Sequence, residues 1–239
     1  PVGRAYQNRK VSMAKTSDMK ARVYSKYSRE VYVCAKNGSV DPGSNPALRA
    51  MIDRAKKEQV PSHVIDKAIA KASSGEGEDF ELAIYEGYGP GKCMVMVVCL
   101  TDNPNRTFGD VRMCFTKTKC KIGTQGSVSH MFDHSIILAF AHDDEDAILE
   151  ILLNADVDVT DVESEDGVIT VFAPHTEYFN AKQALEAALG EIDYNTDEIQ
   201  YLPQNTSPVE GEDLDTFHRF YDLLDDLDDV QNIYHSAEF

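Results

Sequence analysis

The spacing of apolar residues changes at Gly77, and this change limits the possible folds more than any other feature of the chain. Before Gly77, apolar side chains recur every three or four residues, which is the period of an amphipathic helix. After Gly77, short runs rich in β-branched and aromatic residues alternate with helix-length segments. The sequence therefore predicts an α+β protein that begins with helices.

Three helices are expected before Gly77. One apolar stripe marks the first helix and consists of Met19, Val23, Tyr27, Val31 and Cys34. Asn37–Gly38 is a typical helix end, and Asn45–Pro46 supplies an N-cap followed by proline at the first helical position. Pro61–Ser62 starts the third helix. Residues 1–16, which precede these helices, are expected to form a flexible basic arm.

Two sheets with covering helices are expected after Gly77. The expected strands are 82–85, 93–100, 128–132, 136–140, 157–162, 168–172, 198–202 and 230–234. The expected helices are 106–119, 145–154, 177–189 and 214–224. Between residues 136 and 202 the order is βαββαβ, which is the ferredoxin-like unit.

The expected fold class is therefore α+β: an N-terminal three-helix bundle followed by two α+β (ferredoxin-like) domains, one inserted in the other. The strands and helices on either side of the βαββαβ unit complete one another as a two-layer domain, because one sheet face needs helices to cover it. The expected domains are residues 1–76, residues 77–133 with 203–239, and the inserted acidic domain 134–202.

Charge is strongly segregated along the chain, whose net charge is −18. Residues 1–72 contain 15 Lys and Arg against 6 Asp and Glu, whereas residues 122–239 contain 2 basic residues against 28 acidic ones. This asymmetry favours a polyanion-binding N-terminal end and a separate acidic end that offers a docking face to a basic protein. The alternative is that both surfaces are merely solvated and keep the protein soluble.

Candidate nucleic-acid-binding residues come from the basic arm, the first helix and two later positions. They are Arg4, Tyr6, Arg9, Lys10, Lys15, Lys20, Arg22, Lys26, Arg49 and Arg106. Lysine and arginine neutralise phosphates and release counterions, while tyrosine rings stack on exposed bases. Arg106 opens a helix after a buried strand, where free amides bind anions and a cation is otherwise unfavourable. The alternative at this junction is a capping network of Asp102, Asn105 and Thr107.

No cofactor and no metal site is expected. The five cysteines form no CxxC pair, and His130 and His134 lie four residues apart in an extended segment, too far apart to chelate readily. The longest apolar run, Cys93–Leu100, has eight residues and is too short to cross a membrane. We therefore expect a cytoplasmic protein that is not an enzyme. An enzyme using the Asn103–Arg106 loop and the glycine turn at 87–91 is the alternative.

Five motifs occur in one order across nearly the whole chain. They are Gly3–Lys10, Asn45–Arg49, Tyr85–Gly91, Leu100–Thr107 and Gly126–Phe132. Together they resemble the YebC/PmpR family of probable transcriptional regulators, and its YeeN-like branch most closely. Lys92 and His130 depart from the family pattern, in which glycine and tryptophan are common, so fine specificity does not transfer from the main branch.

The resemblance implies a three-domain, cytoplasmic, DNA-binding transcriptional regulator, with a helical first domain and two α+β domains. It also implies an alternative, because relatives are linked to translation: a ribosome-associated translation factor that binds ribosomal RNA.

Overall fold

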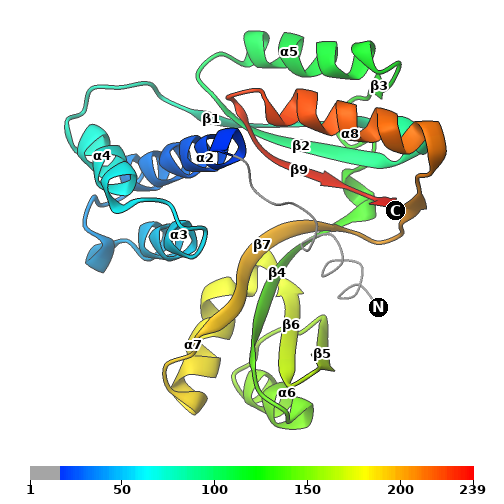
Figure 1. The fold of residues 1–239 in the computed structure, drawn as a ribbon. Helices are drawn as coiled ribbons and strands as arrows, with labels where there is room; N and C mark the ends of the chain where they lie inside the picture. The colour runs from blue at the N-terminus through cyan, green and yellow to red at the C-terminus, as the bar shows by residue number, and fades with distance from the viewer. Residues whose placement is uncertain (1–16) are drawn as a thin grey trace. The chain divides into compact units, whose positions relative to one another are not determined.

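The computed structural model describes residues 17–239, which fall into two compact units (Figure 1). The first unit contains the described residues up to Ser129 together with Thr206–Phe239, and the second contains His130–Asn205. The chain therefore leaves the first unit once and returns to it. The finer division into three domains, with boundaries at 77, 134 and 203, stays a prediction.

Three helices begin the first unit, as the apolar spacing predicts. They are α2 (Ser17–Lys36), α3 (Pro46–Lys57) and α4 (Ser62–Ser73), with a short 3-10 turn, η1 (Pro42–Ser44). Val31, Leu48 and Ala55 are fully buried where the helices meet. Asn45 caps α3, because its side-chain oxygen accepts from the Leu48 N–H at 3.1 Å and its amide donates to the Cys34 carbonyl at 3.0 Å.

An antiparallel sheet with the strand order β3-β1-β2-β9 follows the helices. Its strands are β1 (Glu81–Tyr88), β2 (Met94–Thr101), β3 (Lys121–Ile122) and β9 (Val230–His235). Two helices, α5 (Pro104–Lys117) and α8 (Gly211–Asp225), lie side by side over one face (Figure 1). Phe115 and Phe220 meet edge to face beneath them, with ring centroids 4.9 Å apart. The short strands β8 (Ser207–Pro208) and β10 (Ala237–Glu238) pair in parallel.

The second unit is a ferredoxin-like βαββαβ unit. Its elements are β4 (Phe132–Ala141), α6 (Glu145–Asn154), β5 (Asp161–Glu165), β6 (Val168–Pro174), α7 (Tyr178–Leu189) and β7 (Tyr194–Pro203). The strand order is β5-β6-β4-β7, with every neighbouring pair antiparallel. The predicted fold class, a three-helix bundle followed by two sheet-containing α+β regions, is confirmed.

One predicted strand is wrong. Residues 128–132 do not form a strand; a 3-10 turn, η3 (Ser129–Met131), occupies the segment, and β4 begins only at Phe132. The reason is a buried carboxylate, Glu86 on β1, which is 3% exposed. It accepts hydrogen bonds from the N–H groups of Gly126, Val128 and Ser129 at 2.7, 3.0 and 2.6 Å. Amides held by this carboxylate cannot join a strand ladder.

A second prediction is misplaced by several residues. The strand expected at 157–162 starts at Asp161 instead. The Val157 N–H donates to the Leu152 carbonyl at 3.0 Å, so the chain is still closing the end of α6 at this position. The two-residue strands β3, β8 and β10 are not among the predicted strands, because no periodic pattern can be seen in two residues.

Candidate nucleic-acid interface

The ten predicted site residues divide into two sets. Arg4, Tyr6, Arg9, Lys10 and Lys15 lie outside the described residues. The other five come from three helices: Lys20, Arg22 and Lys26 from α2, Arg49 from α3 and Arg106 from α5. These five are not gathered into one free basic surface, because three of them have carboxylate partners within the chain.

Three cations on one face of α2 contact aspartates near the end of α8 and in front of β9. Arg22 lies 3.1 Å from Asp225 and 3.1 Å from Asp226, and Lys26 also pairs with Asp225. One turn further along, Arg29 lies 2.8 Å from Asp229. We name these three acidic residues, Asp225, Asp226 and Asp229, the aspartate clasp. The clasp attaches the helical region to the first sheet through ion pairs.

Arg106 belongs to the same network. Its Nη2 lies 2.9 Å from Asp229 and 2.7 Å from Asp102. Hydrogen bonds to these two carboxylates raise the pKa of the Arg106 guanidinium above its ordinary value. The N-cap of α5 is Asn103, whose side chain accepts from the Arg106 N–H at 3.2 Å. The expected capping network therefore exists in altered form, with Asn103 rather than Asn105 as the cap.

Asp229 is the centre of this network and is only 7% exposed. It accepts hydrogen bonds from Arg29 at 2.8 Å, from Arg106 at 2.9 Å and from the Thr107 hydroxyl at 2.7 Å. Burial alone would raise the pKa of Asp229, but these hydrogen bonds lower it below its ordinary value. The carboxylate is therefore charged at neutral pH and joins α2, α5 and the start of β9.

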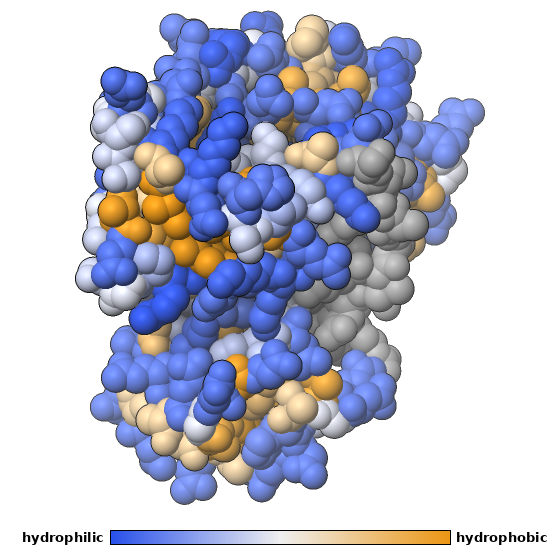
Figure 2. All heavy atoms as spheres, turned by 60° about the vertical axis from the view of Figure 1, so that its left-hand side comes forward, coloured by the Kyte–Doolittle hydropathy of each residue, from blue (hydrophilic) through white to orange (hydrophobic). Residues whose placement is uncertain are grey.

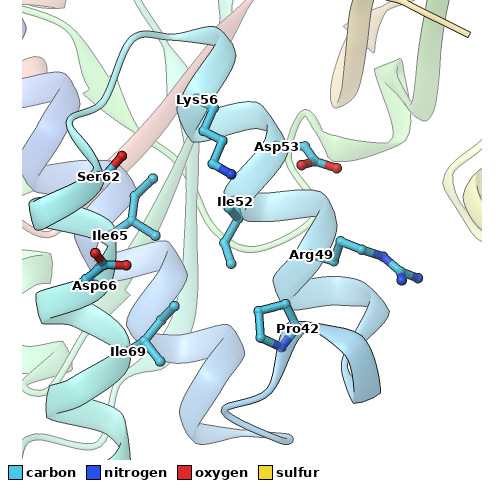
Figure 3. A pocket seen from close by; sticks show the side chains of 9 residues that line it. All are labelled: Pro42, Arg49, Ile52, Asp53, Lys56, Ser62, Ile65, Asp66 and Ile69. Carbon is cyan, nitrogen blue, oxygen red and sulfur yellow. The ribbon is translucent and has the colours of Figure 1, made fainter.

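Two predicted residues are exposed and make no ion pair with any described residue. These are Lys20 on α2 and Arg49 on α3. Arg49 lines a groove of about 480 Å³ between α3 and α4. In Figure 3 its guanidinium points away from the groove, whereas Lys56 points toward the space between the helices. A ligand can therefore bind Lys20 or Arg49 without displacing a carboxylate of residues 17–239.

The groove is lined by apolar and polar side chains together. Ile52, Ile65 and Ile69 line it from both helices (Figure 3). An apolar area surrounded by hydrophilic side chains is visible on the face of the molecule that comes forward in Figure 2. The rim carries cations and carboxylates together, so the groove offers no single sign of charge to a polyanion.

Metal and membrane chemistry find no support in residues 17–239. No group of three or more His, Cys, Asp and Glu there is arranged to hold a metal ion. No helix in this range has the length and apolarity needed to cross a bilayer. Burial raises the pKa of the Cys93 and Cys99 thiols to about 12, so both stay protonated at neutral pH.

The ring of His134 stacks between aromatic neighbours: its centroid lies 3.8 Å from that of His175 and 4.1 Å from that of Tyr201.

Sequence reasoning missed the aspartate clasp. The 28 acidic residues of positions 122–239 are spread so evenly along the sequence that no single carboxylate stands out. The pairing could not be read from residue spacing, because Arg22 and Lys26 share Asp225 while Arg29 contacts Asp229. These partners lie about 200 residues apart in the sequence and are brought together only by the fold.

The fold and the network define a modular α+β protein whose cationic first helix is tied by carboxylates to its own C-terminal region. Family models match along almost the whole chain. Residues 4–75 match the TACO1/YebC protein N-terminal domain, and residues 80–237 match the TACO1/YebC second and third domain. The chain belongs to the TACO1/YebC family; its placement in the YeeN-like branch stays a prediction.

Related proteins share the full length of the chain. A protein of Marinomonas sp. (strain MWYL1), named probable transcriptional regulatory protein, is 68% identical over 238 residues and covers 100% of both chains. A protein of the same description from Alcanivorax borkumensis is 65% identical, covering 99% of both chains. The crystal structure of a conserved hypothetical protein from Aquifex aeolicus has a TM-score of 0.75 at 32% identity, covering 96% of this chain and 94% of that one.

Proposed function

We propose that this protein is a DNA-binding transcriptional regulator that acts in the cytoplasm and catalyses no reaction. The single observation that carries the proposal is the charge segregation, 15 basic against 6 acidic residues in the first 72 positions of a chain with a net charge of −18. The names of the relatives, probable transcriptional regulatory proteins, support a regulatory role. The proposed contacts are phosphates of the nucleic acid, bound by the basic arm together with Lys20 and Arg49.

Three of the candidate residues contribute less to binding in this proposal, namely Arg22, Lys26 and Arg106. Each already has a carboxylate partner, so a phosphate must displace an aspartate before it can bind. Exchanging one anion for another gains little net energy unless the aspartate regains its hydration. The contribution of these three residues is therefore smaller than that of the cations without partners.

The salt dependence of binding tests the proposal. If about 4–6 phosphates are neutralised, the logarithm of the affinity for duplex DNA should fall with the logarithm of salt concentration at a slope of roughly −3 to −5. Changing Arg9, Lys10, Lys15 and Lys20 together to Ala should flatten that slope. Arg219→Ala, which removes an exposed cation of the acidic half, is the control and should leave the slope unchanged. An unaltered slope in the quadruple variant contradicts the proposed contact.

The alternative is a ribosome-associated translation factor that binds ribosomal RNA. Phosphate contacts serve either ligand, so the basic residues do not separate the two. A competition titration does: labelled promoter duplex is displaced by unlabelled duplex of random sequence or by ribosomal RNA. Displacement by ribosomal RNA at concentrations far below those of duplex supports the alternative. We further propose that the acidic C-terminal half is a docking face for a basic protein partner.

The aspartate clasp should weaken nucleic-acid binding, since it competes with phosphate for α2. Changing Asp225 and Asp226 to Asn is expected to raise the affinity about threefold to tenfold, because each exposed ion pair is worth up to about 1 kcal/mol. Fluorescence anisotropy with a labelled oligonucleotide measures the change. Asp213→Asn with Asp215→Asn makes the same charge change on the same helix and is the matched control. An equal gain in the control would mean that net charge, and not release of Arg22 and Lys26, is responsible.

A further inference from the structure

One stretch of this acidic chain contains no acidic residue. The chain has 41 Asp and Glu, yet none occurs between Asp110 and Asp133, where Arg112, Lys117, Lys119 and Lys121 are found. In the structure this stretch runs from α5 through a turn into β3, which is one of the two edge strands of the first sheet. Lys121 lies in this edge strand, Lys117 ends α5 and Lys119 lies in the turn between them, and all three are exposed.

An exposed aromatic ring lies beside these lysines. Lys121 is the cross-strand partner of Tyr88 on β1, and directly opposed residues of an antiparallel pair point to the same sheet face. Tyr88 is 47% exposed. Among the described residues its ring makes no stacking contact with another aromatic side chain. We name Lys117, Lys119, Lys121 and Tyr88 the lysine edge.

The backbone under the lysine edge is firmly held. The Cys120 N–H donates to the Phe115 carbonyl at 2.8 Å, and the Thr118 hydroxyl donates to the Cys114 carbonyl at 3.0 Å. Lys119 adopts a φ of 57°, a left-handed conformation that costs energy in a residue other than glycine. These contacts fix the backbone from which the lysine side chains extend, so a ligand does not have to order the backbone on binding.

The lysines of the lysine edge have no carboxylate partner among residues 17–239, in contrast to the cations that contact the aspartate clasp. Asp225 and Asp229 form ion pairs with four cations of α2 and α5, which are Arg22, Lys26, Arg29 and Arg106. The nearest buried acid of the sheet, Glu86, accepts instead from the backbone N–H groups of the segment 126–129. Cations at alternate positions of one short segment repel one another, and an external anion relieves that repulsion.

A structural role explains only part of this arrangement. Lysine on an edge strand prevents other chains from pairing with the exposed backbone. That role accounts for Lys121, which lies in β3. It does not account for Lys117 at the end of α5 or for Lys119 in the turn, because neither residue lies in the strand ladder.

We propose that the lysine edge binds single-stranded nucleic acid, with phosphates on the three ammonium groups and an unpaired base stacked on Tyr88. Closely spaced lysines with an exposed aromatic ring are the two elements of single-strand recognition, and a base stacks on a side chain only when it is unpaired. The inference rests on the proposed function for the class of ligand. It adds a second binding surface in the sheet domain, distinct from the basic arm and α2.

The test uses the full chain and two oligonucleotides of one sequence, a single strand and its duplex. Changing Lys117, Lys119 and Lys121 together to Gln is expected to weaken single-strand binding at least about tenfold at low salt and to reduce the salt slope by about 2. Tyr88→Ala is expected to weaken it by about fivefold to a hundredfold and to leave duplex binding unchanged. The matched control, Lys92→Gln with Arg219→Glu, makes the same change in net charge at two exposed cations outside both the lysine edge and the basic first 72 residues, and should change the affinity less than twofold.

Each outcome separates this inference from the proposed function. If the matched control weakens binding as much as the lysine-edge triple, binding follows net charge and the inference is overturned. If the lysine-edge triple binds like the wild type while the basic-arm quadruple variant binds weakly, the inference fails and the proposed function stands. If the wild type binds neither oligonucleotide, both fail. Equal losses for single strand and duplex in Tyr88→Ala overturn the stacking role.

Discussion

Replacing Asp229 by Ala is expected to lower the free energy of unfolding by about 3–5 kcal/mol. The substitution leaves the Arg29 guanidinium, which is only 20% exposed, without its carboxylate, and it also removes an acceptor from Arg106 and from the Thr107 hydroxyl. Losing one partner of a buried charge network costs far more than the network contributes to stability, because the remaining charge stays desolvated. Urea denaturation followed by circular dichroism measures the change.

Asp228→Ala is the control for this prediction. The neighbouring Asp228 is exposed, and no ion pair joins it to another described residue, so its replacement should change stability by less than about 0.5 kcal/mol. Asp229→Asn should fall between the two, since an amide oxygen still accepts hydrogen bonds but carries no charge. A loss below about 1 kcal/mol for Asp229→Ala would contradict the central role assigned to this carboxylate.

The effect of Asp229 should also depend on pH. Its folded pKa is lower than its ordinary value of 3.8. A carboxylate of this kind stabilises the fold fully above its unfolded pKa, and the stabilisation is lost as the pH falls through the folded pKa. The stability difference between wild type and Asp229→Asn should therefore be constant near neutral pH and shrink below about pH 3.8.

Replacing Glu86 by Ala is expected to cost about 3 kcal/mol of stability. The backbone N–H groups of Gly126, Val128 and Ser129 lose the carboxylate that accepts from all three, and the Val128 side chain beside them is fully buried. Each buried donor left without an acceptor costs about 1–3 kcal/mol, although water entering the exposed part of the turn relieves some of this cost. Thermal denaturation measures the loss, and hydrogen exchange of the 126–129 amides locates it.

Two further variants sharpen the Glu86 prediction. Glu81→Ala removes an exposed carboxylate from the same strand and should be nearly neutral. Glu86→Gln keeps the shape and one acceptor oxygen, and should cost about half as much as alanine. Burial alone would raise the pKa of Glu86, but the three amides lower it below its ordinary value of 4.5. Its stabilising effect should therefore persist above pH 4.5 and decline below it. Faster exchange spread evenly over the chain, rather than confined to the turn, would contradict a local role.

The helices and the order of the strands could be predicted because their signals are local. The Asn45 side chain caps α3 within three residues of its own position, and the apolar stripe of α2 repeats within single turns. The strand wrongly placed at 128–132 shows the opposite case. Its apolar and β-branched residues do favour a strand, but the acceptor that captures its amides lies 40 residues earlier on β1. The residues near position 128 give no sign in the sequence that Glu86 will accept hydrogen bonds from this segment.

The sequence predicts where the positive charges of the candidate site lie, but not which carboxylates pair with them. The sequence places cations on α2 and at the start of α5, and the structure keeps them there. Whether Arg22 or Arg106 faces solvent or an aspartate depends on how remote elements pack, since the partner is separated by 203 residues in one case and by 123 in the other. The lysine edge had a usable signal, the absence of acids from Val111 to Phe132, which a count over whole segments averaged away.

The aspartate clasp has a consequence for the order of events during synthesis. Arg22 is translated 203 residues before Asp225, and the rest of the three-helix region needs no residue of α8 for its own apolar core. Domains fold in the order in which they leave the ribosome, at about 5–20 residues per second. For roughly ten to forty seconds the nascent chain therefore presents α2 with Arg22, Lys26 and Arg29 bare, and these cations are covered only when the last helix is made.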